Sequence, residues 1–287
     1  MVFMVELCME CFADSFDTAK ALLYKTDAIY SVPYYYSTKK KMSNQSRKQQ
    51  EMARRRKLII AHGRAILARE GYYALTMEKI AAALDYSRGT IYQHFKSKDE
   101  IVGEIGVRSH LLKVELFRRV KGFTGSIRER FFAHIMAYEH FARFYSDHFL
   151  CDEIIRIPSV WSQLPRKNQL SMMRLQYRMQ GPLLDLIRQA VSHGDLPALP
   201  KEGPASIVLG LWSLVETHYS FLATHSPIYR IHYIQDGWEL CRSNAHNLLD
   251  GYGWRPFSHE TDYHAMYERL RNEVFAGEYA SIPMNWS

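Results

Sequence analysis

Apolar residues recur every three or four positions along most of the chain, which is the spacing that predicts α-helices. Runs of β-branched residues are few, and most Gly and Pro residues stand where helices would end. A first helix is predicted from Met52 to a stop at Gly71. Its buried face would consist of Ile59, Ile60, Gly63, Ile66 and Leu67. The pattern as a whole predicts an all-α protein.

Two short helices are predicted next. Thr76 is a natural N-cap for the first of them, whose buried side would carry Met77, Ile80, Ala81 and Leu84. Ser87 can cap the second, which would run to about Phe95 and turn Ile91 into the same core. Asp85 lies in the turn between them, and aspartate tolerates a left-handed backbone better than most residues.

The outer face of the second short helix cannot be buried. It carries Arg88, Thr90, Gln93 and His94. A helix of this width fits the DNA major groove, where arginine can pair with guanine, glutamine with adenine, and a threonine methyl can touch thymine. The backbone N–H groups at the N-terminal ends of the helices that Thr76 and Ser87 cap can donate hydrogen bonds to phosphate oxygens. The pattern therefore predicts a helix-turn-helix reading motif over about residues 76–95.

A longer helix should begin at the capping box formed by Ser97 and Glu100 and run toward Gly122. Residues 126–251 then predict a bundle of longer amphipathic helices. One apolar stripe consists of Phe131, Ile135, Tyr138, Ala142 and Tyr145, and a second of Leu170, Met173, Tyr177, Leu184, Ile187 and Val191.

Proline and glycine divide the bundle. Gly181 and Pro182 should kink or break the second stripe's helix, and Gly203 and Pro204 should start a new helix with proline in its first turn. A last bundle helix would carry Ile231, Ile234, Trp238, Cys241, Ala245 and Leu248.

Composition and charge narrow the class of protein. A chain of 287 residues with 47% hydrophobic residues can bury one large or two modest cores, so disorder throughout is excluded. The longest apolar stretch, 207–215, is too short to span a bilayer, and four acidic residues precede the first lysine, unlike a secretory signal. Four cysteines are too sparse for a disulfide framework. We predict a cytoplasmic protein with no membrane partner.

The net charge of +7 is unevenly distributed. Residues 1–38 hold two lysines against five acidic residues, whereas residues 39–57 hold nine basic residues against Glu51 alone. We expect residues 1–50 to be a disordered leader and linker. DNA binding should not need the leader before Met42, because its negative charge repels phosphate. The leader is either an addition to the family's head or the result of a start codon assigned too early, and the second is slightly favoured. Arg54, Arg55 and Arg56, placed just before the first helix, could add contacts to the DNA backbone.

Several spaced positions together resemble the DNA-binding head of the TetR family of repressors over about residues 53–113. They are Ile80, Ala81, Ser87, Gly89, Thr90, Ile91, Tyr92, Phe95, Ser97, Lys98, Asp99, Glu100 and Ile101. Three positions depart from the family pattern. Asp85 stands where the family usually has a glycine, and Gly63 and Leu67 stand where it usually has an alanine and a phenylalanine.

The resemblance implies that Thr76, Tyr92 and Lys98 contact the phosphate backbone and that residues 88–94 face the bases. The predicted DNA-binding residues are therefore Thr76, Ser87, Arg88, Gly89, Thr90, Tyr92, Gln93, His94 and Lys98. Tyr92 could equally be a packing residue, and Lys98 a solvated lysine. The expected domains are the DNA-binding head at 53–113, a ligand-binding and dimerisation bundle at 114–251, and a C-terminal extension at 252–287.

A homodimer on a palindromic operator and a small-molecule effector are also implied by the resemblance. Ser206, Gly210, Ser213 and Thr217 share one helix face and would let another helix approach closely, either from a second subunit or from within the chain. An adaptable cavity could be lined by Met136, Met172, Met173 and Met179, although such residues form ordinary core far more often than a ligand site. We expect a repressor that needs no cofactor.

Two other classes of function stay open. One is a DNA-binding protein that tolerates any sequence and has no effector. The other is a metal-dependent sensor or enzyme. His148, Cys151 and Asp152 share a helical face and could bind a metal, but no fourth ligand is evident. These three residues are therefore better explained as surface side chains that bind no metal. Cys8 and Cys11 have zinc-like spacing but no second pair follows nearby, and His259 and His264 are one residue too far apart for a zinc-protease helix. We therefore expect no enzyme.

Overall fold

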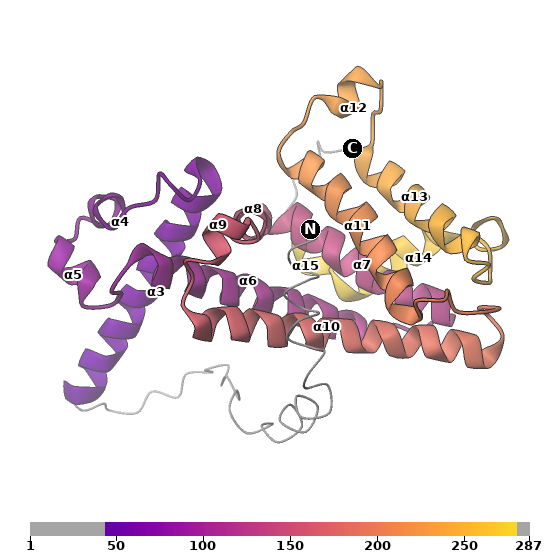
Figure 1. Cartoon of the computed structure of the whole chain (residues 1–287), viewed down its shortest axis with the longest axis horizontal. Coiled ribbons are helices and arrows are strands. Elements are labelled where there is room, and N and C mark those ends of the chain that lie inside the picture. Colours follow the sequence, from indigo (N-terminus) through magenta and orange to yellow (C-terminus); the bar gives the residue numbers. More distant parts are fainter. Residues whose placement is uncertain (1–43, 280–287) are drawn as a thin grey trace. The chain divides into compact units, whose positions relative to one another are not determined.

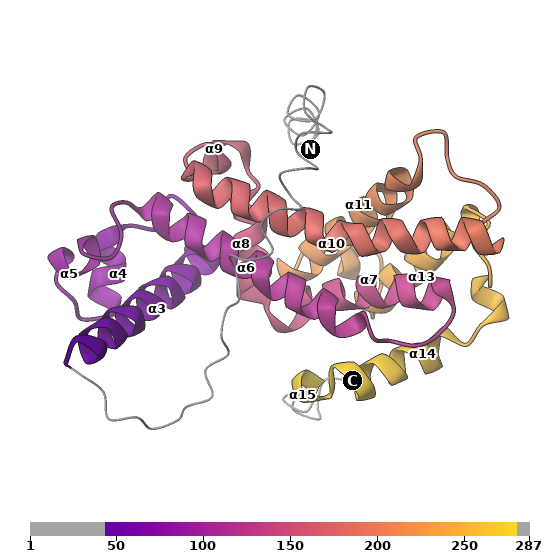
Figure 2. The ribbon, with the colours of Figure 1, turned by 90° about the horizontal axis from the view of Figure 1, so that it is seen from below.

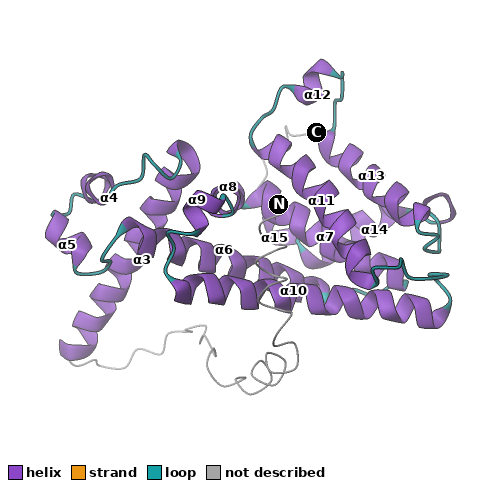
Figure 3. Ribbon diagram, in the orientation of Figure 1, coloured by secondary structure: helices purple, strands orange, loops and turns teal. Residues whose placement is uncertain are grey.

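The computed structural model describes residues 44–279, and every regular element within them is a helix (Figure 1, Figure 3). The prediction of an all-α protein is confirmed. Within the same range, no helix combines the length and the apolar character that crossing a bilayer requires. The helices of the N-terminal part are α3 (Asn44–Glu70), α4 (Met77–Ala83), α5 (Arg88–Tyr92) and α6 (Lys98–Val120).

The C-terminal part is a helical bundle with a helical extension. Its longer helices are α7 (Ile127–Phe144), α8 (Ser146–Ile155), α10 (Arg166–His193), α11 (Pro204–Ala223) and α13 (Gly237–Gly251). Its shorter elements are α9 (Pro158–Trp161), α12 (Ile228–Ile231), the 3₁₀ helix η1 (Ser258–Glu260), α14 (Tyr263–Arg269), the π-helical turn η2 (Leu270–Val274) and α15 (Ala276–Tyr279).

Helix α3 begins at Asn44, well before the predicted Met52. The end of the expected linker, residues 44–50, is therefore helical, and Arg54–Arg56 lie inside the helix rather than ahead of it. The segment is rich in arginine, lysine and glutamine, which favour helix but create no apolar stripe. A search for hydrophobic periodicity could not find it. The rest of the predicted leader lies outside the described residues.

The predicted caps and turn of the two short helices are confirmed. The Thr76 hydroxyl accepts a hydrogen bond from the backbone N–H of Lys79 at 3.1 Å, and the Ser87 hydroxyl accepts one from Thr90 at 3.1 Å. Asp85, between the helices, has φ = 52°, the left-handed conformation that its residue type was expected to tolerate. Helix α5 ends at Tyr92, slightly before the predicted Phe95.

One apolar core fixes α5 against α3, α4 and α6. Ile91 and Phe95 are almost completely buried in it, as predicted. The same core continues into the bundle through Cys151 and Ile155 on α8 and Met172 on α10. The head and the bundle are thus joined by shared packing along α6, which also runs beside α10 (Figure 2).

Helix α7 is the centre of the bundle. All residues from Phe131 to Ala142 are buried, so the predicted stripe on this helix is only part of an element covered on every side. On α10 the predicted stripe is only partly correct, because Ile187 is buried whereas Leu170 and Tyr177 are exposed. The buried apolar positions of α10 are Met172, Leu175, Met179, Leu183, Leu186, Ile187 and Ala190.

Two predicted boundaries are wrong. Helix α10 continues through Gly181 and Pro182 without a break. The turn before Pro182 is exposed at residues 177–178, where water can bond the carbonyl group that proline leaves without a donor. The last bundle helix excludes Ile231 and Ile234, because Asp236 ends the preceding loop and caps α13 by accepting from the N–H groups of Trp238 and Glu239. The helix start at Gly203–Pro204 is confirmed.

The described part of the C-terminal extension is an integral layer of the bundle. Trp254, Met266 and Phe275 are almost completely buried in the same core as α7. The fully buried guanidinium of Arg128 on α7 donates to the carboxylate of Asp250 and to the backbone carbonyl of Trp254. The extension therefore covers α7 and does not hang free of the fold.

Candidate nucleic-acid interface

Helix α5 presents a clear contrast between its two faces. Arg88 has a 70% exposed side chain, Tyr92 is 51% exposed, and Gln93 is also exposed, whereas Ile91 is fully buried. Gly89 lies on the exposed side as well. The exposed row can therefore reach another molecule without disturbing the core that holds the helix.

Arg56 fixes the C-terminal end of α5. Its guanidinium donates to the backbone carbonyl of His94 at 2.9 Å, lies 4.1 Å from the ring centroid of Phe95, and pairs with Glu104 at 3.2 Å. These contacts join α3, the end of α5 and α6. We expected Arg56 to be a possible phosphate contact, and the structure gives it a positioning role that the sequence did not reveal.

Two other predicted DNA-binding residues, Thr90 and His94, interact with neighbouring residues of the protein. The hydroxyl groups of Thr90 and Ser87 lie 2.9 Å apart, so Thr90 bonds back to the cap. Burial, followed by the charges of Arg56 and Arg55, lowers the pKa of the half-buried His94. The ring nitrogens of His94 are therefore those of a neutral imidazole, which can both donate and accept a hydrogen bond.

Lys98 is also held. Its ammonium group donates to the backbone carbonyl of Tyr72 at 3.1 Å and lies 4.0 Å from the centroid of that ring. The hydroxyl group of Tyr72 donates to Asp99 at 2.5 Å. Thr76, the cap of α4, is half-buried on the neighbouring helix. Lys98 is thus a positioned cation at the start of α6, and not a freely solvated side chain.

The residues considered for a metal site have separate partners. His148 faces Ser109 at 2.9 Å, Cys151 donates to the carbonyl of Arg64, and Asp152 pairs with Lys113. Cys151 and Asp152 are buried, so the expectation that they are surface side chains is wrong. Across residues 44–279, no three His, Cys, Asp or Glu side chains gather as metal ligands would. Cys8 and Cys11 lie outside the described residues.

The methionines considered for an effector cavity are core residues here. Met136, Met172 and Met179 are buried, and Met173 is half-buried. On the small-residue face of α11, a Cβ atom added at Gly210 would lie 3.3 Å from the hydroxyl oxygen of Tyr252 and 4.0 Å from Leu248. The space beside Gly210 is therefore bounded by residues of the same chain.

Comparison with known proteins supports the sequence resemblance. Residues 59–105 match the family model described as bacterial regulatory proteins, tetR family. This range holds the C-terminal part of α3, all of α4 and α5, and the first turns of α6. No curated protein matches the chain.

Solved structures match the fold over a larger part of the chain. A TetR family transcriptional regulator, PfmR, from Thermus thermophilus is 20% identical with a TM-score of 0.54, and the match covers 67% of this chain and 97% of PfmR. A bacterial regulatory protein in the tetR family from Rhodococcus RHA1 is 17% identical with a TM-score of 0.55, covering 69% of this chain and 96% of that protein. At these identities the likeness shows the fold: an N-terminal helix-turn-helix domain followed by a helical bundle.

Proposed function

We propose that this chain, a DNA-binding transcriptional regulator whose residues 59–105 carry the N-terminal domain of the tetR family, is a repressor that binds a palindromic operator as a homodimer and responds to a small molecule. The observation that carries the proposal is the exposed row on α5, held by a core on its other side. In this proposal residues 53–113 bind DNA, residues 114–251 form the dimer and the effector-binding body, and the extension covers that body.

The roles at the interface divide by chemistry. Arg88, Thr90, Gln93 and His94 would face base edges, since Arg88 and Gln93 are exposed and Thr90 and His94 are half-buried on or directly after α5. Thr76, Ser87, Gly89, Tyr92 and Lys98 would contact phosphate and sugar oxygens. The position of Lys98, held at the start of α6 by Tyr72, supports the second role because a fixed cation sets the register of the protein on the duplex.

The outward face of α11 supports the dimer. Leu209 is 54% exposed and Phe221 is 40% exposed, and these two large apolar residues flank the smaller Ser213 and Thr217 on one helix face. Exposed apolar residues around small ones suit close packing of two helices. A two-fold dimer through this face would present two α5 helices to one palindrome.

Selection of binding sites from a random DNA pool tests the function directly. A repressor of this kind should enrich one palindrome, with half-sites about one helical turn apart, and should prefer it over random DNA at physiological salt. A sequence-tolerant DNA-binding protein would enrich no sequence, and its affinity would disappear as salt is raised. Enrichment of a site without two-fold symmetry would contradict the dimer but not DNA recognition.

A further inference from the structure

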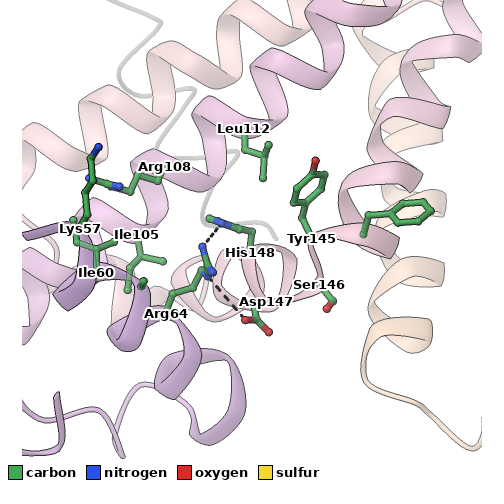
Figure 4. Close-up of a pocket in the computed structure, with 12 residues that line it drawn as sticks. Lys57, Ile60, Arg64, Ile105, Arg108, Leu112, Tyr145, Ser146, Asp147 and His148 are labelled. Atoms are coloured by element: carbon green, nitrogen blue, oxygen red, sulfur yellow. Dashed lines mark hydrogen bonds and ion pairs between the residues drawn. The ribbon is translucent and has the colours of Figure 1, made fainter. Parts of the chain in front are cut away.

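A cleft of about 660 Å³ lies where α3 of the head meets α6 and the start of α8 (Figure 4). Its size is in the range of sites that hold small organic molecules. The exposed row of α5 does not line it. The cleft is therefore separate from the DNA-facing surface, yet one of its walls belongs to a helix of the DNA-binding head.

The lining of the cleft carries more positive than negative charge. Lys57 and Arg64 come from α3 and Arg108 from α6, whereas Asp147 is the one carboxylate that lines it. Burial, Arg56 and Arg64 lower the pKa of Arg108, and Glu104 raises it. The cations of this region thus repel one another and favour an added negative charge.

Arg64 and Arg108 have unused hydrogen-bonding capacity. The Nε atom of Arg64 is buried without a hydrogen-bond partner, and its nearest carboxylate, that of Asp147, lies 4.0 Å away. Among the described residues, none forms a hydrogen bond or ion pair with Arg108, and burial lowers the pKa of its guanidinium. A guanidinium that is partly removed from water without a hydrogen-bonded partner is costly, and an anion would offset that cost.

His148 does not neutralise this charge. The guanidinium of Arg64 donates to its Nε2 atom, so the proton of the neutral ring lies on Nδ1 and is donated to the hydroxyl of Ser109, which in turn donates to the carbonyl of Ile105. Burial, then Arg64 and Arg108, lower the pKa of His148 to about 4. Figure 4 shows Arg64 reaching from α3 toward His148 and Asp147.

The rest of the cleft wall is apolar. Ile60 comes from α3, Ile105 and Leu112 come from α6, and Phe144 closes the end of α7. An inorganic ion would leave this wall in contact with water. A molecule with both an anionic group and a hydrocarbon part would satisfy the two halves of the lining together.

We propose that this cleft binds an amphipathic organic anion, with its carboxylate or phosphate group held by Arg64 and Arg108 and its hydrocarbon part against the apolar wall. The anion would compete with His148 and Asp147 for Arg64, a side chain that links α3 to α8. Binding would therefore change the contact between the head and the bundle and shift the affinity for DNA. This last step rests on the proposed function.

Calorimetric titration of the full chain tests the site with four probes: octanoate, octyl phosphate, octanol and inorganic phosphate. We expect octanoate or octyl phosphate to bind with one molecule per chain, and the tighter of the two identifies the anionic group. Octanol and inorganic phosphate should bind much more weakly, because each satisfies only half of the lining. An affinity for octanol equal to that for the tighter of the two anions would overturn the proposal.

Two variants locate the site. Arg108→Met, which keeps an apolar stem, should weaken binding of the preferred anion by about tenfold or more. Ala61→Trp should block the cleft from an exposed position that also lines it. Arg178→Met removes an exposed arginine from α10 and should leave binding unchanged. Unchanged affinity and stoichiometry in both cleft variants would overturn the proposal, provided that their thermal unfolding matches that of the Arg178 variant.

The effect on DNA is read separately, on the operator obtained by selection. The preferred anion should change operator affinity in the unaltered protein and have no effect in the Ala61→Trp variant. Binding of the anion with no change in DNA affinity would contradict the regulatory step and leave the site intact. Failure of the selection to yield an operator would contradict the proposed function without affecting the titrations.

Discussion

The ammonium nitrogen of Lys113 on α6 lies 2.8 Å from a carboxylate oxygen of Asp152 on α8, and both side chains are almost completely buried. The second carboxylate oxygen lies 3.3 Å from Nδ1 of His110. Burial alone would raise the pKa of Asp152, but Lys113, His110 and Arg156 hold it well below its usual range. A buried ion pair therefore joins α6 and α8, with His110 and Arg156 close to the same carboxylate.

Lys113→Met should be strongly destabilising, because it leaves the buried carboxylate of Asp152 without its main partner. We expect the free energy of unfolding to fall by about 3–5 kcal/mol in chemical denaturation. The double variant Lys113→Met with Asp152→Leu should regain most of this loss, since replacing both members of a buried pair by apolar groups is often neutral.

The control is Arg118→Met, which breaks the exposed pair between Arg118 and Glu115 on the same helix. It should leave the free energy of unfolding nearly unchanged, because an exposed ion pair contributes little to stability. A similar cost for Lys113→Met and Arg118→Met would show that water reaches the buried pair.

Acid should destabilise the fold through buried neutral histidines. Burial is the largest effect in each, lowering the pKa of His110, His134 and His148 to about 4 and that of His140 and His246 to about 3. The unfolded chain protonates these rings near pH 6.5 while the folded chain does not. Stability should therefore fall as pH drops from about 6.5 toward 4, by about 1.4 kcal/mol per pH unit for each ring.

Glu139 has the opposite effect on stability, because burial raises its pKa to about 7. This single carboxyl group offsets only part of the combined effect of the five histidines. His134→Leu isolates a single ring, because Nδ1 of His134 bonds only the carbonyl of Arg130 and Nε2 is buried without a partner. The slope of unfolding free energy against pH should decrease by about 1.4 kcal/mol per unit in this variant. Equal slopes in this variant and in the unaltered protein would contradict the assignment.

Alanine variants of Arg88 and Lys98 should distinguish a residue that recognises bases from one that contacts the phosphate backbone. Arg88→Ala should cost about 1–3 kcal/mol on the selected operator and relax the base preference at one position per half-site. Lys98→Ala should weaken operator and random DNA alike and reduce the slope of log affinity against log salt by about one.

Lys121→Ala, at the exposed far end of α6, serves as the control and should leave both affinities unchanged. Lys98 also contacts Tyr72, so thermal unfolding of its variant must be compared with that of the control. A change of base preference in the Lys98 variant would show that its assigned role is wrong.

Local chemistry made the head predictable. The caps at Thr76 and Ser87 and the left-handed turn at Asp85 each depend on atoms within three or four residues, which a sequence displays directly. The role of Arg56 could not be found in this way, because one arginine in a basic run looks like the others until the fold brings it to the carbonyl of His94.

The sequence predicted that the bundle consists of amphipathic helices, but it did not predict which face of each helix is buried. On α10, apolar residues such as Tyr177 stand beside the buried positions, and only the packing of α6 and α7 decides which row is covered. Buried polar groups on α7, such as Glu139, pair with residues distant in the sequence, such as Arg242 at 2.8 Å, and the local sequence does not indicate these pairs. Tertiary contacts therefore determine which helix faces and which polar partners are buried, and hydrophobic periodicity alone does not show this.

The dimer is tested at Leu209, because a side chain added at Gly210 would first meet Tyr252 of its own chain. Leu209→Glu should bring like charges together across a two-fold axis and convert dimer to monomer in sedimentation experiments. Operator affinity should then fall far more than affinity for an isolated half-site. Tyr177→Glu, at an exposed apolar residue of α10, is the matched control. An intact dimer of the Leu209 variant would remove this face of α11 from the interface.

Gly63 should be required by the packing of α3 on α6. A Cβ atom there would lie 2.9 Å from Cγ2 of Ile101, a fully buried β-branched side chain that cannot easily move. Alanine normally stabilises a helix interior by about 1 kcal/mol relative to glycine, but overpacking costs about 1–3 kcal/mol. Gly63→Ala should therefore destabilise the protein by about 1 kcal/mol, even though the TetR family usually has alanine at this position.

Gly181→Ala on α10 provides the matched control, since nothing lies within 4 Å of an added Cβ atom there, and it should stabilise the protein by up to about 1 kcal/mol. The double variant Gly63→Ala with Ile101→Leu removes the Cγ2 methyl while keeping the side-chain volume, so it should be more stable than Gly63→Ala alone. If Gly63→Ala and Gly181→Ala raise the thermal unfolding midpoint equally, Ile101 yields to the added methyl without cost. The packing of α3 on α6 would then not require glycine at position 63.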